Sequence, residues 1–269
     1  MFLMAQKRHI PVVLSIAGSD NSGGAGIQAD LKTFTTLGVY GTTAITCVVA
    51  EHPGRVKSIT PIPARAVREQ IDLVFEAFPI AAVKTGMLYS AEIIEAVVSG
   101  LKAHKKKKPF FLVVDPVMVA TSGALLFKAE ALEVLQKRLL PLADLVTPNL
   151  DEAEVLLGHP LTNLAEAQEA AVFSQQIWRV PFLIKGGHLN LSQATDFLFD
   201  GKTMHSYQAP TVRKIKTHGN GCTYSAAIAA ELAKGKTLHA AISSAKKFIT
   251  RAIRDHFRLG QFQPLNQLP

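Results

Sequence analysis

Short apolar runs alternate along the chain with longer amphipathic segments. The runs that predict strands are Val12–Ala17, Thr42–Val49, Ile80–Lys84, Phe110–Asp115, Asp144–Thr147 and Phe182–Lys185. The segments that predict helices are Gly24–Leu37, Ala64–Phe78, Ala91–Ala103, Ala129–Leu139, Leu164–Trp178, Asn220–Lys234 and Leu238–Phe257. Several strand candidates are apolar throughout, as is typical of strands covered on both faces. The alternation therefore predicts βαβ units around a mostly parallel sheet.

The last third of the chain departs from this alternation. Asp196–Phe199 and Met204–Tyr207 flank a turn at Asp200-Gly201, a pattern that predicts a β-hairpin. The polar segment from Gln261 to Pro269 is expected to fray. Because no linker rich in Gly, Ser or Pro and no internal repeat interrupts the pattern, we expect one domain over residues 1–269.

Polar and glycine-rich residues follow the predicted strands. They are Gly18-Ser19-Asp20, Glu51, Lys84-Thr85-Gly86, Asp115-Pro116, Thr147-Pro148-Asn149 and Lys185-Gly186-Gly187. Ligands of open α/β sheets bind outside the carboxyl ends of parallel strands. The sequence thus predicts a ligand crevice at this edge.

The composition is that of a globular protein, with 48% hydrophobic and 19% charged residues among 269. The formal net charge is +8, and the run Lys105–Lys108 contributes to it. Such a run is typical of a solvated loop. We find no base-reading motif and expect no nucleic-acid partner. A mild positive potential also suits nucleotide phosphates.

The two cysteines, Cys47 and Cys222, make no disulfide framework, and the sequence has no CxxC or His/Cys metal cluster. This favours a reducing compartment. The start of the chain shows no signal peptide, and no run of about 18 apolar residues predicts a membrane span. We therefore expect a cytoplasmic protein without a membrane partner.

The segment from Gly18 to Gly26 is rich in glycine and lies between a predicted strand and a helix. Glycines permit tight turns and close approach to a ligand, and a helix start offers free N–H groups. The segment matches neither a Walker A loop nor a dinucleotide fingerprint. A purely structural turn is an equal alternative.

A second glycine loop, Gly219-Asn220-Gly221, runs into a strong helix former. Its N–H groups can converge on developing negative charge. Cys222 then falls in the first helical turn, where the helix dipole is expected to lower the thiol pKa and favour a general base. The alternative is a small buried residue, which is also our prediction for Cys47, inside an apolar strand.

Acidic and amide side chains at two further strand ends suit Mg²⁺. Asn149 and Glu152 open a helix, and Asp115 ends an apolar strand. Helix capping and turn formation are the competing interpretations. Lys185, beside two glycines, is placed to lie along a polyphosphate, although an isolated lysine is more often solvated.

The order of these motifs resembles the hydroxymethylpyrimidine/phosphomethylpyrimidine kinases, over about residues 12 to 255. The matching blocks are Ile16–Thr33, Lys84–Leu88, Val114–Met118, Thr147–Ala153, Lys185–His188 and Thr217–Thr223. The resemblance implies a ribokinase-like fold, an αβα sandwich with a central, mostly parallel sheet. It also implies phosphorylation of a hydroxymethylpyrimidine, or of its monophosphate, by ATP and Mg²⁺ for thiamin synthesis.

The resemblance also assigns roles to residues. Those implied for the pyrimidine site are Gly18, Asp30, Glu51, Met87 and Val117. Those implied for the metal are Asp115 and Glu152, with Asn149 nearby, and those for nucleotide are Lys185, His218 and Lys246. The anion hole implied from His218 to Cys222 includes Gly219, Asn220 and Gly221, with Cys222 as the base. Relatives outside this branch carry Asp at the position of Cys222.

Three positions depart from the family pattern. Glu51 replaces the usual Gln, and a carboxylate accepts a hydrogen bond from a 4-amino group but donates none to a ring nitrogen. We expect it to shift the balance between the alcohol and the monophosphate, toward the monophosphate. Asn220 replaces Thr, with a modest effect expected because backbone groups do most of the binding. Thr121 stands where Lys is frequent, which removes a phosphate contact.

Pyridoxine or pyridoxal kinase is the nearest alternative, because that substrate is also a ring bearing a hydroxymethyl group. A non-catalytic ligand-binding protein on the same fold is more distant, since Asp115, Glu152 and Cys222 are all present. Nucleic-acid binding is the weakest alternative. Members of the family are often homodimers.

Overall fold

The structure is a computed structural model, and it describes residues 9–118, 129–187, 192–212, 215 and 217–268. Thr121 and His188 lie outside these residues. The strands are β1 (Val12–Asp20), β2 (Tyr40–His52), β3 (Arg55–Pro61), β4 (Ile80–Thr85), β5 (Phe111–Val114), β6 (Leu145–Val146), β7 (Phe182–Lys185), β8 (Gln193–Phe199) and β9 (Met204–Pro210). The α-helices are α1 (Gly26–Thr36), α2 (Ala64–Ala77), α3 (Ala91–Lys105), α4 (Ala129–Val134), α5 (Leu150–Leu157), α6 (Leu164–Trp178), α7 (Asn220–Ala233) and α8 (Leu238–Arg254).

Within the described residues, these strands form one sheet in the order β3-β2-β1-β4-β5-β6-β7-β8-β9. Neighbours from β2 to β7 are parallel, whereas β3, β8 and β9 pair antiparallel. The predicted parallel centre and the predicted C-terminal hairpin are both confirmed.

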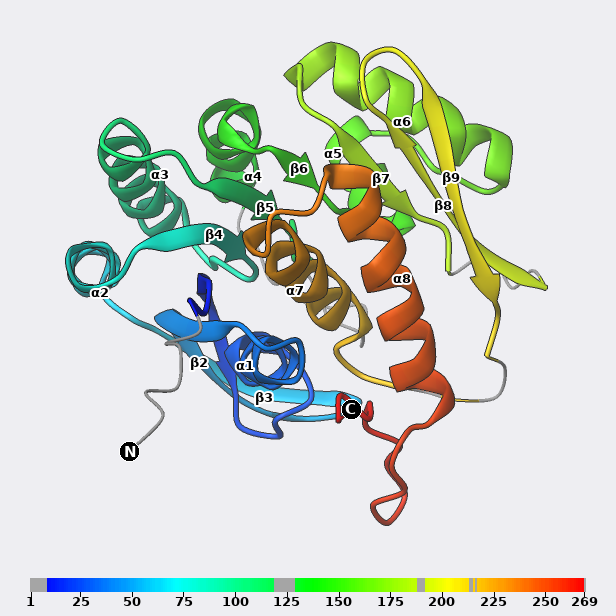
Figure 1. Cartoon of the computed structure of the whole chain (residues 1–269), viewed down its shortest axis with the longest axis horizontal. Helices are drawn as coiled ribbons and strands as arrows, with labels where there is room; N and C mark the ends of the chain where they lie inside the picture. Colours follow the sequence, from blue (N-terminus) through cyan, green and yellow to red (C-terminus); the bar gives the residue numbers. More distant parts are fainter. Residues whose placement is uncertain (1–8, 119–128, 188–191, 213–214, 216, 269) are drawn as a thin grey trace, which may run out of the picture.

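Helices cover both faces of the sheet and make a three-layer αβα sandwich, as expected (Figure 1). Helices α1, α7 and α8 pack on one face, and α2 to α6 lie on the other. Two apolar cores separate the layers, one on each face. In α7 the alanine-rich stretch from Ala226 to Ala230 is fully buried. These small side chains let the helix approach β4 and β5 closely.

Strand β3 was not predicted from the sequence. Its side chains are exposed or half-buried throughout, so it carries no apolar run. It pairs with the end of β2, which continues beyond the predicted Val49 to His52. The resulting hairpin, which turns at Gly54 with a φ of 92°, extends the wall beside the predicted crevice.

Helix α5 was predicted only by its start at Asn149, and the other predicted helices and strands differ mainly at their ends. The segment from Gln261 was expected to fray, but its described part packs on the fold: Leu265 is buried in the core, and the Gln267 side chain donates to Thr223 (3.3 Å). The helix predicted over Ala129–Leu139 is α-helical to Val134 and then has a π-helical turn over Leu135–Leu139. The last helix ends at Arg254 rather than Phe257. Lys106, Lys107 and Lys108 are exposed, as predicted for that charge run. In the described part of the chain, no helix has the length and apolar character to cross a membrane.

Candidate active site

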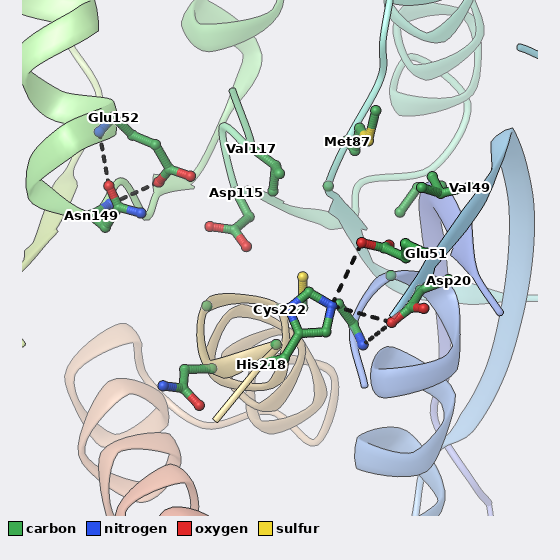
Figure 2. A pocket seen from close by; sticks show the side chains of 18 of the residues that line it. Asp20, Val49, Glu51, Met87, Asp115, Val117, Asn149, Glu152, His218 and Cys222 are labelled. Atoms are coloured by element: carbon green, nitrogen blue, oxygen red, sulfur yellow. Dashed lines mark hydrogen bonds and ion pairs between the residues drawn. The ribbon is translucent and has the colours of Figure 1, made fainter. Parts of the chain in front are cut away.

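The carboxyl ends of the parallel strands open onto a cavity of about 420 Å³. Its lining comes from the ends of β1, β2, β4, β5 and β7, from the starts of α5 and α7, and from Val56 on β3 (Figure 2). Thirteen of the fifteen predicted site residues line it, namely Gly18, Glu51, Met87, Asp115, Val117, Asn149, Glu152, Lys185, His218, Gly219, Asn220, Gly221 and Cys222. The predicted position of the crevice is therefore confirmed.

The two glycine-rich loops meet directly. Gly219, which precedes α7, has a φ of 82°, and a Cβ there would overlap the carbonyl oxygen of Gly24. Gly26 has a φ of 57°, and a Cβ there would overlap the carbonyl of Gly18. Both positions need glycine for conformation and for space. The contact fixes the start of α7 against the loop after β1.

Asp20 shapes the loop after β1, a role that the sequence interpretation missed. Its carboxylate accepts hydrogen bonds from the amides of Ser22 (2.7 Å), Gly24 (3.1 Å) and Ala25 (2.8 Å). Burial favours a higher pKa for Asp20, but its bonds to His218 and to these amides outweigh burial and hold the pKa well below the usual range. Asp20 is thus a carboxylate that organises the loop.

The loop before α7 has the form expected of an anion hole. The first helical hydrogen bond runs from the Thr223 amide to the Gly219 carbonyl (2.9 Å), so the amides of residues 220–222 lie ahead of the helical bonding pattern. The side chain of Asn220 accepts a hydrogen bond from Thr217 (2.7 Å) and is exposed. Its replacement of the usual Thr therefore leaves the backbone of the loop in place.

Cys222 lines the cavity, and Figure 2 shows its sulfur directed toward the space between Asp115 and Glu51. The predicted lowering of the pKa of the Cys222 thiol is wrong. Burial is the largest cause and raises the pKa to about 11; the charge of Lys84 lowers it, and that of Asp115 raises it further. These effects outweigh the helix end, so Cys222 is a thiol at neutral pH.

Asp115 is held by three donors at the end of β5. Lys185 donates to Oδ1 (3.0 Å), Thr147 also donates to Oδ1 (3.1 Å), and Ser225 donates to Oδ2 (3.0 Å). Burial favours a higher pKa for Asp115, but Lys185 and then Lys84 lower it, and the net shift is downward. A Cβ on Gly221 would lie 3.1 Å from the Lys185 ammonium, so this lysine fits closely against the anion loop.

Asn149 and Glu152 form a reciprocal capping box at the start of α5. The backbone N–H of Asn149 donates to the Glu152 carboxylate (2.8 Å), and the backbone N–H of Glu152 donates to Oδ1 of Asn149 (2.8 Å). The competing interpretation, helix capping, is thereby confirmed, yet both residues also line the cavity. Burial raises the pKa of Glu152 to about 8, with Lys185 lowering it and Asp115 raising it.

These carboxylates fit a divalent cation. Asp115 and Glu152 are both buried, the charge of Asp115 raises the pKa of Glu152, and Lys185 is the nearby positive charge. Mg²⁺ commonly binds through one or two carboxylates and keeps several waters. The side-chain oxygen of Asn149 already accepts the hydrogen bond that caps α5. The two carboxylates and water are therefore better ligands for a cation here than the Asn149 side chain.

The other side of the cavity combines a polar cluster with an apolar wall. His218 Nε2 lies 3.3 Å from Asp20 Oδ2 and 4.0 Å from Glu51 Oε2 (Figure 2). Met87 and Val117 belong to an apolar cluster that also contains Cys47, Val49 and Val56. Cys47 is fully buried, as predicted. The cavity thus combines apolar side chains with the Glu51–His218 pair.

Asp30 does not line the cavity, contrary to its predicted role. It is fully buried on α1 and accepts hydrogen bonds from Ser15 (2.5 Å) and from Lys84 (2.8 and 2.9 Å). Lys84, which was not assigned a role, lines the cavity in its place. Burial favours a lower pKa for Lys84, but the charge of Asp30 outweighs it and raises the pKa above the usual range. The charge of Lys84 lowers the pKa of Cys222, and that of Asp30 opposes this effect.

A second cavity, of about 610 Å³, adjoins the first between β8, β9, α7 and α8. The two share Asn149, Lys185, Thr217, Asn220 and Gly221. Lys246 lines only the second, where it donates to Asp196 (2.6 Å). His218, predicted for nucleotide, lines only the first, because its ring turns toward Asp20 and Glu51. Lys185 therefore stands between two adjoining compartments.

This fold and this site define a kinase of the ribokinase-like class. The family model for phosphomethylpyrimidine kinase matches residues 20–266. The chain belongs to the phosphomethylpyrimidine kinase family. It is 47% identical over 259 residues to the hydroxymethylpyrimidine/phosphomethylpyrimidine kinase of Haemophilus influenzae, with 94% of each chain covered. It is also 45% identical to the thiamine biosynthesis bifunctional protein ThiED of Geobacter sulfurreducens, covering 95% of this chain but 52% of that protein.

Solved structures of two kinds of kinase resemble the chain. A pyridoxal kinase of Bacillus subtilis, an ADP complex, superposes with a TM-score of 0.86 at 39% identity, covering 96% of this chain and 97% of that one. The phosphomethylpyrimidine kinase of Clostridium difficile superposes with a TM-score of 0.79 at 41% identity, covering 90% and 99%. The fold thus accommodates both substrate classes.

Proposed function

We propose that this protein transfers the γ-phosphoryl group of ATP to the hydroxymethyl group of 4-amino-5-hydroxymethyl-2-methylpyrimidine, which gives the monophosphate, or to the phosphate of that monophosphate, which gives the diphosphate used in thiamin synthesis. The observation that carries this proposal is the place of the loop over Gly219–Cys222. Asn220 and Gly221 of this loop line both the cavity that contains the apolar side chains of Met87 and Val117 and the second cavity, and Lys185 lines both as well. Family membership supports the same activity.

The loop over Gly219–Cys222 stabilises the phosphoryl group during its transfer. In phosphoryl transfer, charge accumulates on the equatorial oxygens, and positioned donors stabilise it. The amides that precede the helical bonding of α7 and the ammonium of Lys185 are the donors here. A bound Mg²⁺ supplies charge neutralisation to the nucleotide phosphates. Asp115 and Glu152 are the residues that would hold it, in part through water.

When the substrate is the alcohol, Cys222 acts as a thiolate: its own proton first leaves to solvent, and the thiolate then takes the proton of the attacking hydroxyl. Its raised pKa means that the thiol gives up its own proton only when the surrounding charge becomes more positive. Lys84 already favours the thiolate, and neutralising Asp115 removes a charge that opposes it. Cys222 is therefore a base that becomes effective as the site is filled, not one that is ionised beforehand.

The second cavity is the nucleotide side of the site. It lies next to the anion loop and offers apolar side chains from α8, such as Ile249 and Ile253, beside Lys246. The Lys246 ammonium already pairs with Asp196. Lys246 therefore contributes mainly by positioning Asp196 and by placing its own aliphatic side-chain carbons at the cavity wall. ATP bound there would reach Lys185 with its phosphates.

Glu51 and His218 set the preference between alcohol and monophosphate. Burial favours a lower pKa for His218, but its bond to Asp20 and the charge of Glu51 outweigh burial and raise it, which favours the charged form of the ring next to the loop over Gly219–Cys222. That charge suits a substrate already bearing a phosphate, while the Glu51 carboxylate accepts from the 4-amino group.

The change Glu51→Gln tests this assignment. It replaces the Glu51 carboxyl group with an amide and removes the charge that helps to raise the pKa of His218. We expect the ratio of kcat/KM for monophosphate over alcohol to fall by about tenfold, the worth of one charged hydrogen bond. An unchanged ratio would contradict the assignment.

Pyridoxal phosphorylation is the second candidate activity, favoured by the pyridoxal kinase of known structure at a TM-score of 0.86. A coupled assay of ADP release, with ATP, Mg²⁺ and in turn the pyrimidine alcohol, its monophosphate and pyridoxal, separates the two. We expect the highest kcat/KM with a pyrimidine. A higher value of kcat/KM with pyridoxal would overturn the proposal. Release of ADP at the same rate with and without a phosphoryl acceptor would show that the protein hydrolyses ATP and is not a kinase.

The homodimer implied by the family resemblance is tested by sedimentation equilibrium.

A further inference from the structure

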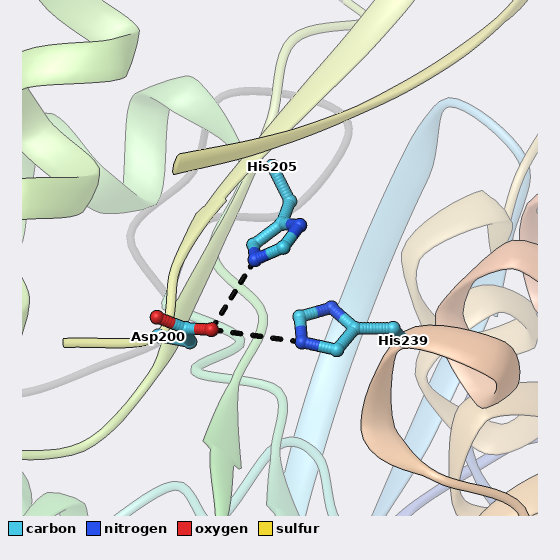
Figure 3. Close-up of side chains that lie close together, drawn as sticks. All are labelled: Asp200, His205 and His239. Atoms are coloured by element: carbon cyan, nitrogen blue, oxygen red, sulfur yellow. Dashed lines mark hydrogen bonds and ion pairs between the residues drawn. The ribbon is translucent and has the colours of Figure 1, made fainter. Parts of the chain in front are cut away.

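Three metal-ligand side chains meet at the turn between β8 and β9, outside both cavities (Figure 3). Asp200 follows β8, His205 lies on β9, and His239 lies in the first turn of α8. Asp200 Oδ2 is 3.2 Å from His205 Nε2 and 3.6 Å from His239 Nε2. Figure 3 shows both rings directed at this one oxygen. One ligand atom from each residue lies within 4.8 Å of the other two.

Hydrogen bonds to neighbouring groups orient two of the three side chains. Asp200 Oδ1 accepts from the amides of Lys202 (2.8 Å) and Thr203 (2.8 Å), which leaves Oδ2 toward the rings. Tyr207 Oη lies 2.8 Å from His239 Nδ1, so Nε2 is the ring nitrogen that faces Asp200. Contacts of this kind fix the tautomer and the ring direction of metal-binding histidines.

The charge balance of the cluster also favours a cation. The two imidazole rings lie with centroids 4.1 Å apart, a separation at which two protonated rings repel each other. The hydrogen bonds from the amides of Thr203 and Lys202 are the main cause that lowers the pKa of Asp200 to about 2, so the carboxylate is charged at neutral pH. The Asp200 carboxylate and the two ring nitrogens thus form a compact set of possible ligand atoms.

We propose that Asp200, His205 and His239 bind a divalent transition-metal ion of the Zn²⁺ class. Two imidazole nitrogens and one carboxylate oxygen form a common zinc ligand set, with water in the fourth position. All three side chains are partly exposed, at 26%, 32% and 43%, so a water ligand and an entry path are available. Imidazole suits zinc, copper and nickel, whereas Mg²⁺ prefers oxygen ligands. The site is thus chemically distinct from the Asp115–Glu152 pair.

The site lies at the edge of the sheet opposite the active site. Strand β8 runs antiparallel to β7, with Asp196 opposite Lys185 at the active-site end and Phe199 opposite Phe182 at the other end. Asp200 follows Phe199. The metal therefore joins the β8–β9 turn to the start of α8 and acts as a clamp on the fold. It takes no part in phosphoryl transfer.

Sequence spacing hides this cluster, because strand β9 and the whole of helix α7 lie between Asp200 and His239 in the sequence. Only the packing of α8 beside β9 brings them together. The alternative is a hydrogen-bonded network in which Asp200 pairs with two histidines and binds no metal. The two differ in a measurable way.

The test is a Zn²⁺ titration of the untagged, EDTA-dialysed chain by calorimetry, with the midpoint of thermal unfolding, Tm, measured in parallel. We expect the wild type to bind Zn²⁺ with a rise in Tm, because a ligand of the folded state stabilises it. His205→Ala and His239→Ala should each bind at least about tenfold more weakly and lose the rise in Tm. Asp200→Asn, which can keep the turn hydrogen bonds, should do the same.

The matched control is His159→Ala, which removes an exposed histidine outside the cluster and should keep the wild-type response. Circular dichroism and Tm in zinc-free buffer check that each variant folds. In that buffer kcat should equal that of the wild type. Absence of Zn²⁺ binding, or equal binding by the wild type and both histidine variants, would overturn the proposal. The second outcome would place zinc elsewhere, for instance at Asp20, Glu51 and His218.

Discussion

The change Gly219→Ala probes the contact on which the active-site geometry depends. A Cβ at this position would overlap the Gly24 carbonyl oxygen and lie 2.8 Å from its carbon and 3.1 Å from Ala25 Cα. Carbon atoms in contact lie about 3.5–4.0 Å apart, so the two loops must separate by about 1 Å. A displacement of that size near reacting atoms costs about 10²-fold in rate. At about 1.4 kcal/mol per tenfold, this raises the barrier by nearly 3 kcal/mol.

The same substitution also strains the backbone, and this effect needs a control. An alanine at a φ of 82° costs about 1–2 kcal/mol of stability. Gly235→Ala is matched to it, because Gly235 has a φ of 84° and nothing lies within 4 Å of its Cβ position. Gly235 follows α7 at the end away from the cavity. It should lose about the same stability from strain and keep its activity.

The assay is steady-state ADP release with the pyrimidine monophosphate, combined with urea unfolding of both variants. We expect kcat to fall about 100-fold for Gly219→Ala and to stay within about twofold of the wild type for Gly235→Ala. If Gly219→Ala kept wild-type kcat while losing as much stability as Gly235→Ala, the contact between the two loops would have no part in catalysis.

Three further predictions follow from the buried charges. Cys222→Ala should lower kcat by about 10²–10⁴-fold in the coupled assay, and near-full activity would exclude it as the base. Asp30→Ala leaves Lys84 buried without its partner and should destabilise the fold by about 3–5 kcal/mol in urea unfolding, whereas a raised KM at unchanged stability would restore Asp30 to the substrate site. Because the pKa of Glu152 is raised to about 8, the folded state binds its proton more tightly than the unfolded state. The Glu152 contribution to stability should therefore fall as pH rises from about 4.5 to 8 in EDTA, and Glu152→Gln should flatten that dependence; an equal slope in both proteins would contradict the raised pKa.

The sequence predicted the elements whose side chains face one environment throughout. Strands such as β4 and β7 are continuous apolar runs because helices cover both their faces, and this pattern is legible without a structure. Strand β3 lacks such a run, because it lies at the edge of the sheet and its side chains are exposed or half-buried. Val56, which lines the active-site cavity, was missed with it.

Residue roles were predictable where they depend on neighbours in sequence and not where they depend on long-range pairing. Asn149 and Glu152 were recognised as a helix start because their partners are three residues apart. Asp30 pairs with Lys84, 54 residues away, and nothing local distinguishes that buried ion pair from a ligand contact. The pKa of Cys222 was predicted in the wrong direction because its helix position is local, whereas its burial and the charge of Asp115 arise from the fold.

The most direct test of the central claim is ³¹P NMR of the chain mixed with ATP, Mg²⁺ and the pyrimidine monophosphate. The account predicts that the γ-phosphoryl signal of ATP declines while the coupled pair of signals of a pyrimidine diphosphate grows in equal amount, and that Gly219→Ala slows both changes together. Release of inorganic phosphate in place of the diphosphate, or no change in the ATP signal, would contradict it.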